Sequence, residues 1–311
     1  MQLAIVIPFY KIDYFDITLE SLALQTDKRF NVYIGDDASP HNLKKLLKQY
    51  KGKFKFTYNR FQYNLGGQSL VKQWCRCIDL TQGEPWIMIL GDDDYLEDNL
   101  VENWYNEYLN FSGKSNVIRF ATKPIDLINN NVSKQYFHPK WESSSDFFKR
   151  KFLGETRSSL SEYIFKREVF ELYGFYDYPL GWHSDDRAWL EFSNHLPIFS
   201  INKSFVFIRI STASITGKSN NLNEKRKATI EFYRFIILKK NFFLDSKIKY
   251  GLVRHYESAL RNSSGLSFFD FLFLFKVYLK TDLVKLFSFL KRSIKAFFQL
   301  KLLRSYLPFA R

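Results

Sequence analysis

Apolar residues follow two different spacings in the first hundred residues of the chain. Short apolar runs with the length and the β-branched and aromatic content of buried strands lie at residues 3–9, 30–36, 54–60 and 85–91. Between these runs, apolar residues recur at helical spacing over residues 13–25, 43–51 and 69–80. Strands that alternate with helices of this length predict an α/β fold, with a mostly parallel, Rossmann-like central sheet and flanking helices.

The pattern changes in the rest of the chain. After residue 112 it becomes irregular, with strand-like segments at 116–125 and 204–211, and from about residue 225 it is helical. Residues 217–223 are rich in Gly, Ser and Asn, which is typical of a loop between structural units. The sequence therefore predicts an α/β domain at residues 1–217 and a helical C-terminal region at residues 224–311.

The net charge of +14 lies in the helical region. Residues 225–311 hold 19 Lys and Arg against 5 Asp and Glu, whereas residues 1–224 hold 27 of each kind. The apolar face of the last predicted helix holds Leu283, Phe287, Leu290, Ile294 and Phe297, and its polar face holds Lys285, Ser288, Arg292, Lys295 and Gln299. A basic amphipathic helix of this kind fits the surface of an anionic membrane, although a helix packed on the rest of the chain would show the same pattern.

The sequence lacks the features of a nucleic-acid-binding protein, a targeting signal and a membrane span. The aromatic residues of the tail gather on one apolar face instead of alternating with cations, so we expect no nucleic-acid partner. The chain shows no recognisable targeting signal, and no run approaches the roughly 20 apolar residues of a membrane span. Together with the basic tail, this predicts a cytoplasmic protein attached peripherally to the inner face of the cell membrane.

Two acidic clusters follow predicted strands. Asp36 and Asp37 come after the second strand, and Asp92, Asp93 and Asp94 come after the fourth. Ligands of open α/β sheets bind at the carboxyl ends of the strands, where both clusters belong. Three neighbouring carboxylates repel one another unless a cation lies between them, and Mg²⁺ or Mn²⁺ prefers oxygen ligands completed by substrate phosphates. The alternative is a solvated acidic turn that caps a helix over residues 95–109.

Several short motifs, in order, resemble those of family 2 glycosyltransferases of the GT-A fold. They read "AIVIPFYK", "TLESLALQT", "VYIGDDAS", "YNLGG", "ILGDDDYLEDNL" and "WHSDDRAWLE". The resemblance covers roughly residues 1–216. Within the family, the sequence resembles bacterial members that build capsule, O-antigen and exopolysaccharide. It implies an enzyme that transfers a sugar from a nucleotide sugar to a growing glycan.

The resemblance also implies a donor-binding group of residues. By position in the motifs, these are Pro8, Tyr10, Asp36, Asp37, Asn64, Gly66, Asp92 and Arg209. Tyr10 would pack near the base, and Asp36 and Asp37 would meet the base or ribose. Arg209 would contact the diphosphate, with packing at a strand edge as the alternative. Relatives often carry a histidine two residues later that contributes to the metal or diphosphate site, and this chain has Ser211 there.

The metal site implied by the family lies in the aspartate run. Asp92 and Asp94 match the metal-binding DxD pattern literally, whereas alignment on the following "YL" places the metal-proximal carboxylate at Asp93. Any of Asp92, Asp93 and Asp94 could bind Mn²⁺ or Mg²⁺ directly, and the alignment favours Asp93.

The acidic pair Asp185 and Asp186 matches the family's catalytic pair, with Asp186 in the position of the base. An inverting transfer needs one group to accept the proton of the acceptor hydroxyl. Simple N-capping of a helix over residues 187–196 is the alternative for this pair. Trp182 and His183 precede the pair and are expected on the acceptor side.

The sequence thus predicts an inverting, metal-dependent hexosyltransferase that uses a nucleotide sugar, with UDP-sugars favoured, and a hydroxyl of a growing, lipid-linked bacterial glycan as acceptor. A phosphohydrolase fits poorly, because its nucleophilic aspartates would be expected after the first strand, which ends "IPFY". A membrane-associated sugar-nucleotide-binding protein that has lost catalysis is the remaining alternative, which Ser211 keeps open.

Overall fold

The structure is a computed structural model. It describes residues 2–128, 134–211, 215, 217, 220–239, 244–263 and 265–305, with side chains of the last helix described up to residue 296. The chain divides into two compact units, Met1–Ala228 and Thr229–Arg311.

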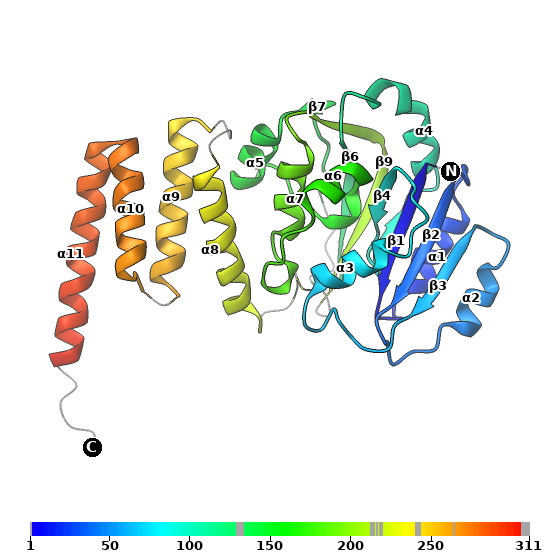
Figure 1. Ribbon diagram of the computed structural model, residues 1–311, viewed down its shortest axis with the longest axis horizontal. Coiled ribbons are helices and arrows are strands. Elements are labelled where there is room, and N and C mark those ends of the chain that lie inside the picture. Colours follow the sequence, from blue (N-terminus) through cyan, green and yellow to red (C-terminus); the bar gives the residue numbers. More distant parts are fainter. Residues whose placement is uncertain are drawn as a thin grey trace, which may run out of the picture. The chain divides into compact units, whose positions relative to one another are not determined.

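The first unit is built on a sheet whose N-terminal strands are parallel (Figure 1). Its four predicted strands are all present, as β1 (Leu3–Phe9), β2 (Phe30–Asp36), β3 (Phe56–Arg60) and β4 (Trp86–Ile89). β1 pairs with β2 and β4, and β2 pairs with β3, all in parallel register. The loops that follow β1, β2 and β4 therefore meet at one edge of the sheet, which is where the acidic clusters lie.

The later strands extend the same sheet with mixed directions. They are β5 (Tyr95–Leu96), β6 (Val117–Asp126), β7 (Trp141–Glu142), β8 (Tyr163–Lys166) and β9 (Ile198–Ile210). The strand order is β3-β2-β1-β4-β8-β6-β9-β5, and β7 pairs with β9. β8 is antiparallel to both β4 and β6, while β6 and β9 are parallel. The long strand β9 runs past the acidic loop that precedes β5, and its last residues reach the site described below.

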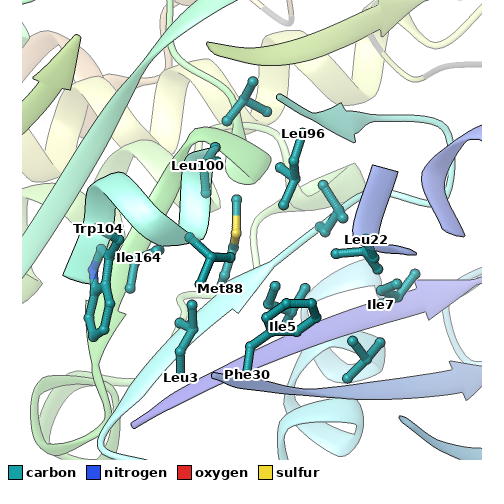
Figure 2. Close-up of a cluster of buried hydrophobic side chains, with 14 of the residues drawn as sticks. Leu3, Ile5, Ile7, Leu22, Phe30, Met88, Leu96, Leu100, Trp104 and Ile164 are labelled. Atoms are coloured by element: carbon teal, nitrogen blue, oxygen red, sulfur yellow. The ribbon is translucent and has the colours of Figure 1, made fainter. Parts of the chain in front are cut away.

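Helices cover both faces of the sheet because β1, β2 and β4 are apolar on both sides. On one face, α1 (Phe15–Ala23), α2 (Lys44–Tyr50) and α4 (Leu100–Phe111) bury a continuous apolar core. Figure 2 shows alternate residues of β1 in this core, with Trp104 of α4 nearby. Alternation along the strand sends every second side chain to each face, and the opposite face receives Ala4 and Val6.

The other face is covered by α3 (Leu70–Ile78), α6 (Arg167–Tyr173) and α7 (Ser184–Phe192), with α5 (Ser144–Phe152) packed on α7. Aromatic side chains fill this layer. Phe165 of β8 contacts Phe175, Trp189 and Phe192 with ring centroids 5.3 to 5.8 Å apart. This packing holds α7, whose first turn carries Asp185 and Asp186, against the sheet.

Two helix starts differ from the prediction, and both differences concern the acidic residues. The predicted helix over 95–109 begins only at Leu100, since Tyr95 and Leu96 form β5 and pair with β9. The aspartate run therefore does not cap a helix. α7 begins at Ser184 instead of residue 187, so Asp185 and Asp186 lie in its first turn and neither is the N-cap.

The second unit is helical, as predicted. It contains the end of α8 (Leu222–Leu238), and α9 (Ser246–Arg261), α10 (Phe268–Thr281) and α11 (Leu283–Ser305) (Figure 1). Its core is formed by Val253, Tyr256, Leu260, Leu274, Tyr278, Leu286 and Phe289. Within the described residues, no helix combines the length and the apolar character needed to cross a bilayer.

α11 carries apolar residues on two sides. Leu286 and Phe289 are buried in the core of the helical unit, whereas Leu283, Phe287 and Ile294 are 59, 65 and 56% exposed. The three exposed residues belong to the stripe that the sequence singled out, of which Phe297 lies outside the described side chains. Leu290 of the same stripe packs against the core of the unit, so the stripe is only partly exposed.

Candidate active site

The carboxylate of Asp92 joins the ends of β1 and β4. Its Oδ2 accepts hydrogen bonds from the backbone N–H groups of Tyr10 at 2.8 Å and Lys11 at 2.7 Å. These are the first residues after β1, so Asp92 fixes the loop in which Tyr10 lies. Burial, together with the neighbouring charge of Asp93, raises the pKa of Asp92 to about 6. The structural role of Asp92 is thus to hold the loop after β1 against the loop after β4.

Asp94 joins the aspartate run to β9. Its Oδ1 accepts the backbone N–H of Arg209 at 2.9 Å, and its Oδ2 accepts the hydroxyl of Ser161 at 2.6 Å. Burial and the charge of Asp93 raise its pKa to about 7. A side chain on Gly91 would place its Cβ 3.0 Å from Oδ2 of Asp94, so the glycine allows the loop to pack closely against this carboxylate.

Asp93 differs from its two neighbours. In the described part of the chain, no hydrogen bond from another residue reaches its carboxylate, and the side chain lines a cavity. Lys11 and Arg209 are near enough to oppose the rise in its pKa that burial causes. The guanidinium of Arg209 donates to the backbone oxygen of Asp93 and lies over the ring of Tyr14, 4.2 Å from its centroid.

These contacts determine how a metal ion could be held. Among the described residues, no group of three His, Cys, Asp or Glu side chains is arranged to hold one. Both oxygens of Asp94 and Oδ2 of Asp92 accept hydrogen bonds from other parts of the chain, so Asp93 is the least engaged of the three carboxylates. Mg²⁺ and Mn²⁺ are commonly held by one or two carboxylates with substrate phosphates and water, so the residues present fit a cation that arrives with a diphosphate.

The second acidic cluster is also engaged in hydrogen bonds. Asp36 is fully buried, and its oxygens accept from the N–H of Ser39 at 2.8 Å and the hydroxyl of Tyr58 at 2.6 Å. It also pairs with Arg60 at 2.8 Å. Asp36 therefore anchors the turn after β2.

Asp37 holds the glycine turn that precedes α3. Its Oδ1 accepts the N–H of Leu65 at 2.7 Å and pairs with Arg76, and its Oδ2 accepts the N–H of Gly66 at 2.9 Å. The side chain of Asn64 accepts the N–H of Gly67 at 2.5 Å, which closes the same turn. The predicted donor residues Tyr10, Asp37, Asn64 and Gly66 are thus held along one edge of the sheet, and the half-buried Pro8 lies at the end of β1.

The acidic pair at the start of α7 has two different environments. Asp186 is buried, with Lys151 of α5 on Oδ1 and Nδ1 of His183 2.7 Å from Oδ2. These two groups lower the pKa of Asp186 in spite of its burial, which acts in the opposite direction. For Asp185, burial and the charge of Asp186 raise the pKa to about 7.

One cavity joins the two acidic groups. It has a volume of about 440 Å³ and is lined by Asp93, Asp94 and Arg209 together with Trp182, His183, Asp185 and Asp186. The sequence analysis expected these residues in a common site, and the structure brings them together. A cavity of this size accommodates a sugar-sized ligand.

The cavity also contains residues that the sequence analysis missed. Lys151 belongs to the last turn of α5, and Arg157, Ser158 and Ser159 belong to the loop that follows. Basic residues at the end of a short helix normally satisfy its terminal carbonyls, so nothing in the local sequence marked Lys151 as part of the site. Only the packing of α5 on α7 brings it to Asp186.

A comparison with protein families shows which family the chain belongs to. The family model described as glycosyl transferase family 2 matches residues 4–163, which include the loops that carry Tyr10, Asp37, Gly66 and Asp93. The chain belongs to glycosyl transferase family 2. It is therefore a glycosyltransferase, as the motifs implied. No protein of curated function matches the chain.

Solved structures of TarS from S. aureus have the same fold. A TarS fragment in complex with UDP-GlcNAc has a TM-score of 0.63 and 15% sequence identity over 84% of this chain and 73% of that chain. The same fragment in complex with UDP has a TM-score of 0.60 and 18% identity over 85% of this chain and 73% of that chain. The likeness confirms the prediction of a GT-A fold followed by a helical region.

Proposed function

We propose that this family 2 glycosyltransferase moves a hexose from a nucleotide-diphosphate sugar, with a UDP-sugar as the favoured donor, to a hydroxyl of a growing glycan with inversion of configuration. The observation that carries the proposal is the shared cavity, which Asp93 lines together with Asp185 and Asp186. An inverting transfer needs both groups, because the diphosphate must leave as the acceptor hydroxyl loses its proton.

The donor would bind along the loops after β1, β2 and β3. The exposed ring of Tyr10 would pack on the base, and Asp37, Asn64 and Gly66 would lie beside the nucleoside. Of the two carboxylates after β2, Asp37 is favoured for this role because it holds the turn that carries Gly66. The relative TarS has been solved with UDP-GlcNAc and with UDP, which supports a uridine nucleotide as the first donor to test.

The diphosphate would lie at Asp93 and Arg209. When bound, Mn²⁺ or Mg²⁺ would neutralise the charge of the departing diphosphate, with Asp93 as its direct protein ligand. Asp92 and Asp94 would contribute by fixing the loop in which Asp93 lies, through their bonds to the residues after β1 and to β9. Arg209 lines the cavity and would add a permanent positive charge next to the diphosphate.

The acceptor would enter beside Trp182 and His183, and its proton would pass to the group built around Asp185 and Asp186. Both aspartates, with Lys151 and Arg157, line this part of the cavity. Two cationic side chains next to the acidic pair would suit an acceptor that carries negative charge.

The C-terminal unit supports a peripheral membrane location at the cytoplasmic leaflet, where a lipid-linked acceptor would be found. The exposed stripe Leu283, Phe287 and Ile294 of α11 is apolar, and the tail is strongly basic. Apolar side chains that enter the interface and cations that meet anionic headgroups are the two contributions such attachment requires.

Isothermal titration calorimetry tests the proposed donor by measuring nucleotide affinity. UDP, GDP and dTDP would each be titrated into the full chain with Mn²⁺ and with a chelator. We expect one nucleotide to bind, with much higher affinity in Mn²⁺. Equal affinity in the two conditions would contradict the metal site, and no binding by any nucleotide would contradict the donor class.

A catalytically impaired sugar-nucleotide-binding protein is the second candidate. The observation in its favour is Ser211, which stands where relatives carry a histidine near the diphosphate. Such a protein would bind the nucleotide in the calorimeter but release none from a sugar nucleotide. A turnover assay with a panel of donors therefore separates it from an active transferase.

A further inference from the structure

A group of lysines in the first unit is not part of the site described above. Residues 38–78 hold seven lysines and two arginines but no Asp or Glu. Because residues 1–224 hold equal numbers of basic and acidic residues, this segment gathers positive charge on a body that is neutral as a whole. Six of the seven lysines lie between residues 44 and 55, so most of the surplus belongs to one short stretch of the chain.

These six lysines lie at the outer edge of the sheet, on α2 and in the turn that leads to β3 (Figure 1). In the described sheet, β3 is the outermost strand. α2 buries Leu47 and Tyr50 against the core of the unit and leaves Lys44, Lys45 and Lys48 exposed. The basic side of α2 is therefore the side that does not pack on the unit.

A hollow with a volume of about 770 Å³ lies between α2 and the start of β3. Its lining, which we call the lysine hollow, consists of Lys44, Leu47, Lys48, Lys51, Gly52, Phe54, Lys55 and Phe56. The apolar side chains of the lining are buried or half-buried, whereas its four lysines are exposed. The hollow therefore has an apolar inner surface and a rim of ammonium groups.

The rim carries charge that the chain itself does not balance. In the part of the chain that the structure describes, none of the four lysines of the hollow has a carboxylate partner. Lys44 and Lys48 are four residues apart on α2, a spacing at which like charges destabilise a helix. An anion from outside the chain would remove this repulsion. Lysines on an ordinary solvated face would not need an apolar lining between them.

We propose that the lysine hollow binds the headgroup of an anionic phospholipid and gives the first unit a membrane contact of its own. The ammonium groups would meet the phosphate, while the lysine stems and Phe56 would lie along the glycerol and the start of the acyl chains. The inference goes beyond the proposed function, which assigns the membrane contact to the C-terminal unit, and it does not depend on glycosyl transfer.

A nucleic acid is the other polyanion that a group of lysines could bind. Proteins that hold single strands combine positive charge with aromatic rings on which the bases stack. Phe54 is 7% exposed and Phe56 is half-buried, so neither offers a free face for a base. The apolar lining and the cationic rim together fit a lipid headgroup better.

The lysine hollow lies away from the proposed donor site. Residues 51–55 precede β3, whereas Arg60 at the other end of that strand pairs with Asp36. The donor loops follow the carboxyl ends of the parallel strands, so a lipid in the hollow would leave them open. Substitutions in the hollow should also leave the donor site intact.

Flotation of the full chain tests the proposal, with vesicles of phosphatidylcholine that contain or lack phosphatidylglycerol. The triple variant Lys44→Gln, Lys48→Gln and Lys51→Gln should bind the anionic vesicles at least about tenfold more weakly than the wild type. One well-placed lysine contributes about fivefold to the affinity for an anionic membrane, and the remaining lysines of the hollow retain part of the attraction.

A matched triple variant controls for the loss of charge. Lys114→Gln, Lys134→Gln and Lys203→Gln remove the same three charges from exposed positions outside the hollow. This control should bind anionic vesicles nearly as tightly as the wild type, because charges away from the membrane contact are screened by salt. Melting temperatures close to that of the wild type show that both triple variants are folded.

Hydrogen exchange of the wild-type chain locates the contact directly. Amides of residues 44–56 should exchange more slowly when vesicles with phosphatidylglycerol are added, and vesicles of phosphatidylcholine alone should have no effect. A purely structural role of the lysines would not produce protection that depends on the lipid.

Three results would overturn the inference. The first is an equal loss of vesicle binding in the two triple variants, and the second is exchange at residues 44–56 that anionic vesicles do not change. The third is slower exchange there with a single-stranded RNA but not with vesicles, which would assign the hollow to a nucleic acid. A wild-type chain that binds no anionic vesicle would contradict the proposed membrane location as well.

Discussion

The backbone N–H of Gly66 donates a 2.9 Å hydrogen bond to Oδ2 of Asp37, and a methyl group on Gly66 would lie 2.6 Å from the same oxygen. Carbon and oxygen atoms cannot approach so closely without displacing the loop or the carboxylate. The glycine is therefore required by close packing against Asp37, since its φ is not in the left-handed region.

Gly66→Ala should weaken UDP binding by at least about tenfold, equal to about 1.4 kcal/mol, because it moves Asp37 away from the nucleoside. Calorimetry of UDP with Mn²⁺ measures the change. Gly52→Ala is the control, since Gly52 has a positive φ of 87° and no atom within 4 Å of an added Cβ. It should lower stability without changing affinity, and equal affinities for wild type and Gly66→Ala would remove Asp37 from the donor site.

Asp93→Ala tests the metal. We expect the variant to bind UDP with the same affinity in Mn²⁺ and in chelator, because the carboxylate that would hold the cation is gone. The exposed Asp98, which lies between β5 and α4, supplies the control Asp98→Ala, which should keep the full effect of Mn²⁺. If Asp93→Ala keeps that effect as well, the cation is held elsewhere.

Asp185→Asn should stabilise the protein at neutral and higher pH. Burial and the charge of Asp186 raise the pKa of Asp185 to about 7, so the ionised form is disfavoured in the folded state. The unfolded chain ionises near the ordinary value of 3.8, so this destabilisation is fully present above about pH 7 and fades as the pH falls towards 3.8.

Thermal unfolding across pH checks this sign. The melting temperature of Asp185→Asn should exceed that of the wild type at pH 8, and the difference should shrink steadily towards pH 4. Asp13→Asn, at an exposed position before α1, should leave the profile unchanged. A difference that grows as the pH falls would show that Asp185 is stabilised as a carboxylate in the folded protein.

The sequence predicted the parallel half of the sheet well, and the mixed half poorly. Runs such as residues 3–9 are apolar on both faces because helices cover both sides, and that pattern is local. The position of β9 between β6 and β5 depends on pairing between distant segments, and Tyr95–Leu96 became a strand because β9 lies beside it. Spacing along the chain cannot reveal such pairing.

The sequence motifs indicated which residues belong to the candidate site, but not which hydrogen bonds and ion pairs those residues form. Asp92, Asp93 and Asp94 are equivalent in the sequence, and only the donors that reach them from Tyr10, Ser161 and Arg209 distinguish them. Lys151 could not be found, since its role depends on the packing of α5 against α7. Whether Asp92 to Asp94 or Asp185 and Asp186 cap a helix depends on the residue at which each helix begins. Sequence patterns fix that residue only to within a few positions.

Glu257→Gln should destabilise the helical unit. Glu257 is fully buried and forms ion pairs with Arg254, Arg261 and Arg292. Burial raises its pKa, but hydrogen bonds from Arg292 and Tyr278 outweigh this effect and lower the pKa to about 2. The loss should be about 3 kcal/mol, the low end for a broken buried pair, because the arginines keep some contact with water.

Hydrogen exchange of α9 to α11 measures this loss at neutral pH. The wild-type advantage should persist above pH 4.5 and disappear as the pH falls towards 2, because the carboxylate loses its charge in that range. Glu231→Gln, another carboxylate of the same unit and an exposed one, is the matched control. Unchanged exchange in Glu257→Gln would mean that the cluster contributes little.

The exposed stripe of α11 can be separated from the charge of the tail. The double variant Phe287→Ser and Ile294→Ser should lose much of its binding to anionic vesicles, while high salt should weaken wild-type binding only in part. Leu109→Ser, at an 86% exposed position of α4, is the control and should bind as the wild type does. Flotation of vesicles measures binding, and a wild-type chain that ignores anionic vesicles would refute the membrane role.

The rate of nucleotide release from a panel of UDP-sugars tests the central claim most directly. The full chain would be incubated with UDP-GlcNAc and other UDP-hexoses in Mn²⁺, in chelator, and as the Asp93→Ala variant. We predict UDP release from at least one donor in Mn²⁺, and almost none with chelator or with Asp93→Ala. Tight binding of UDP without release from any donor in Mn²⁺ would contradict the account and favour a protein that only binds sugar nucleotides.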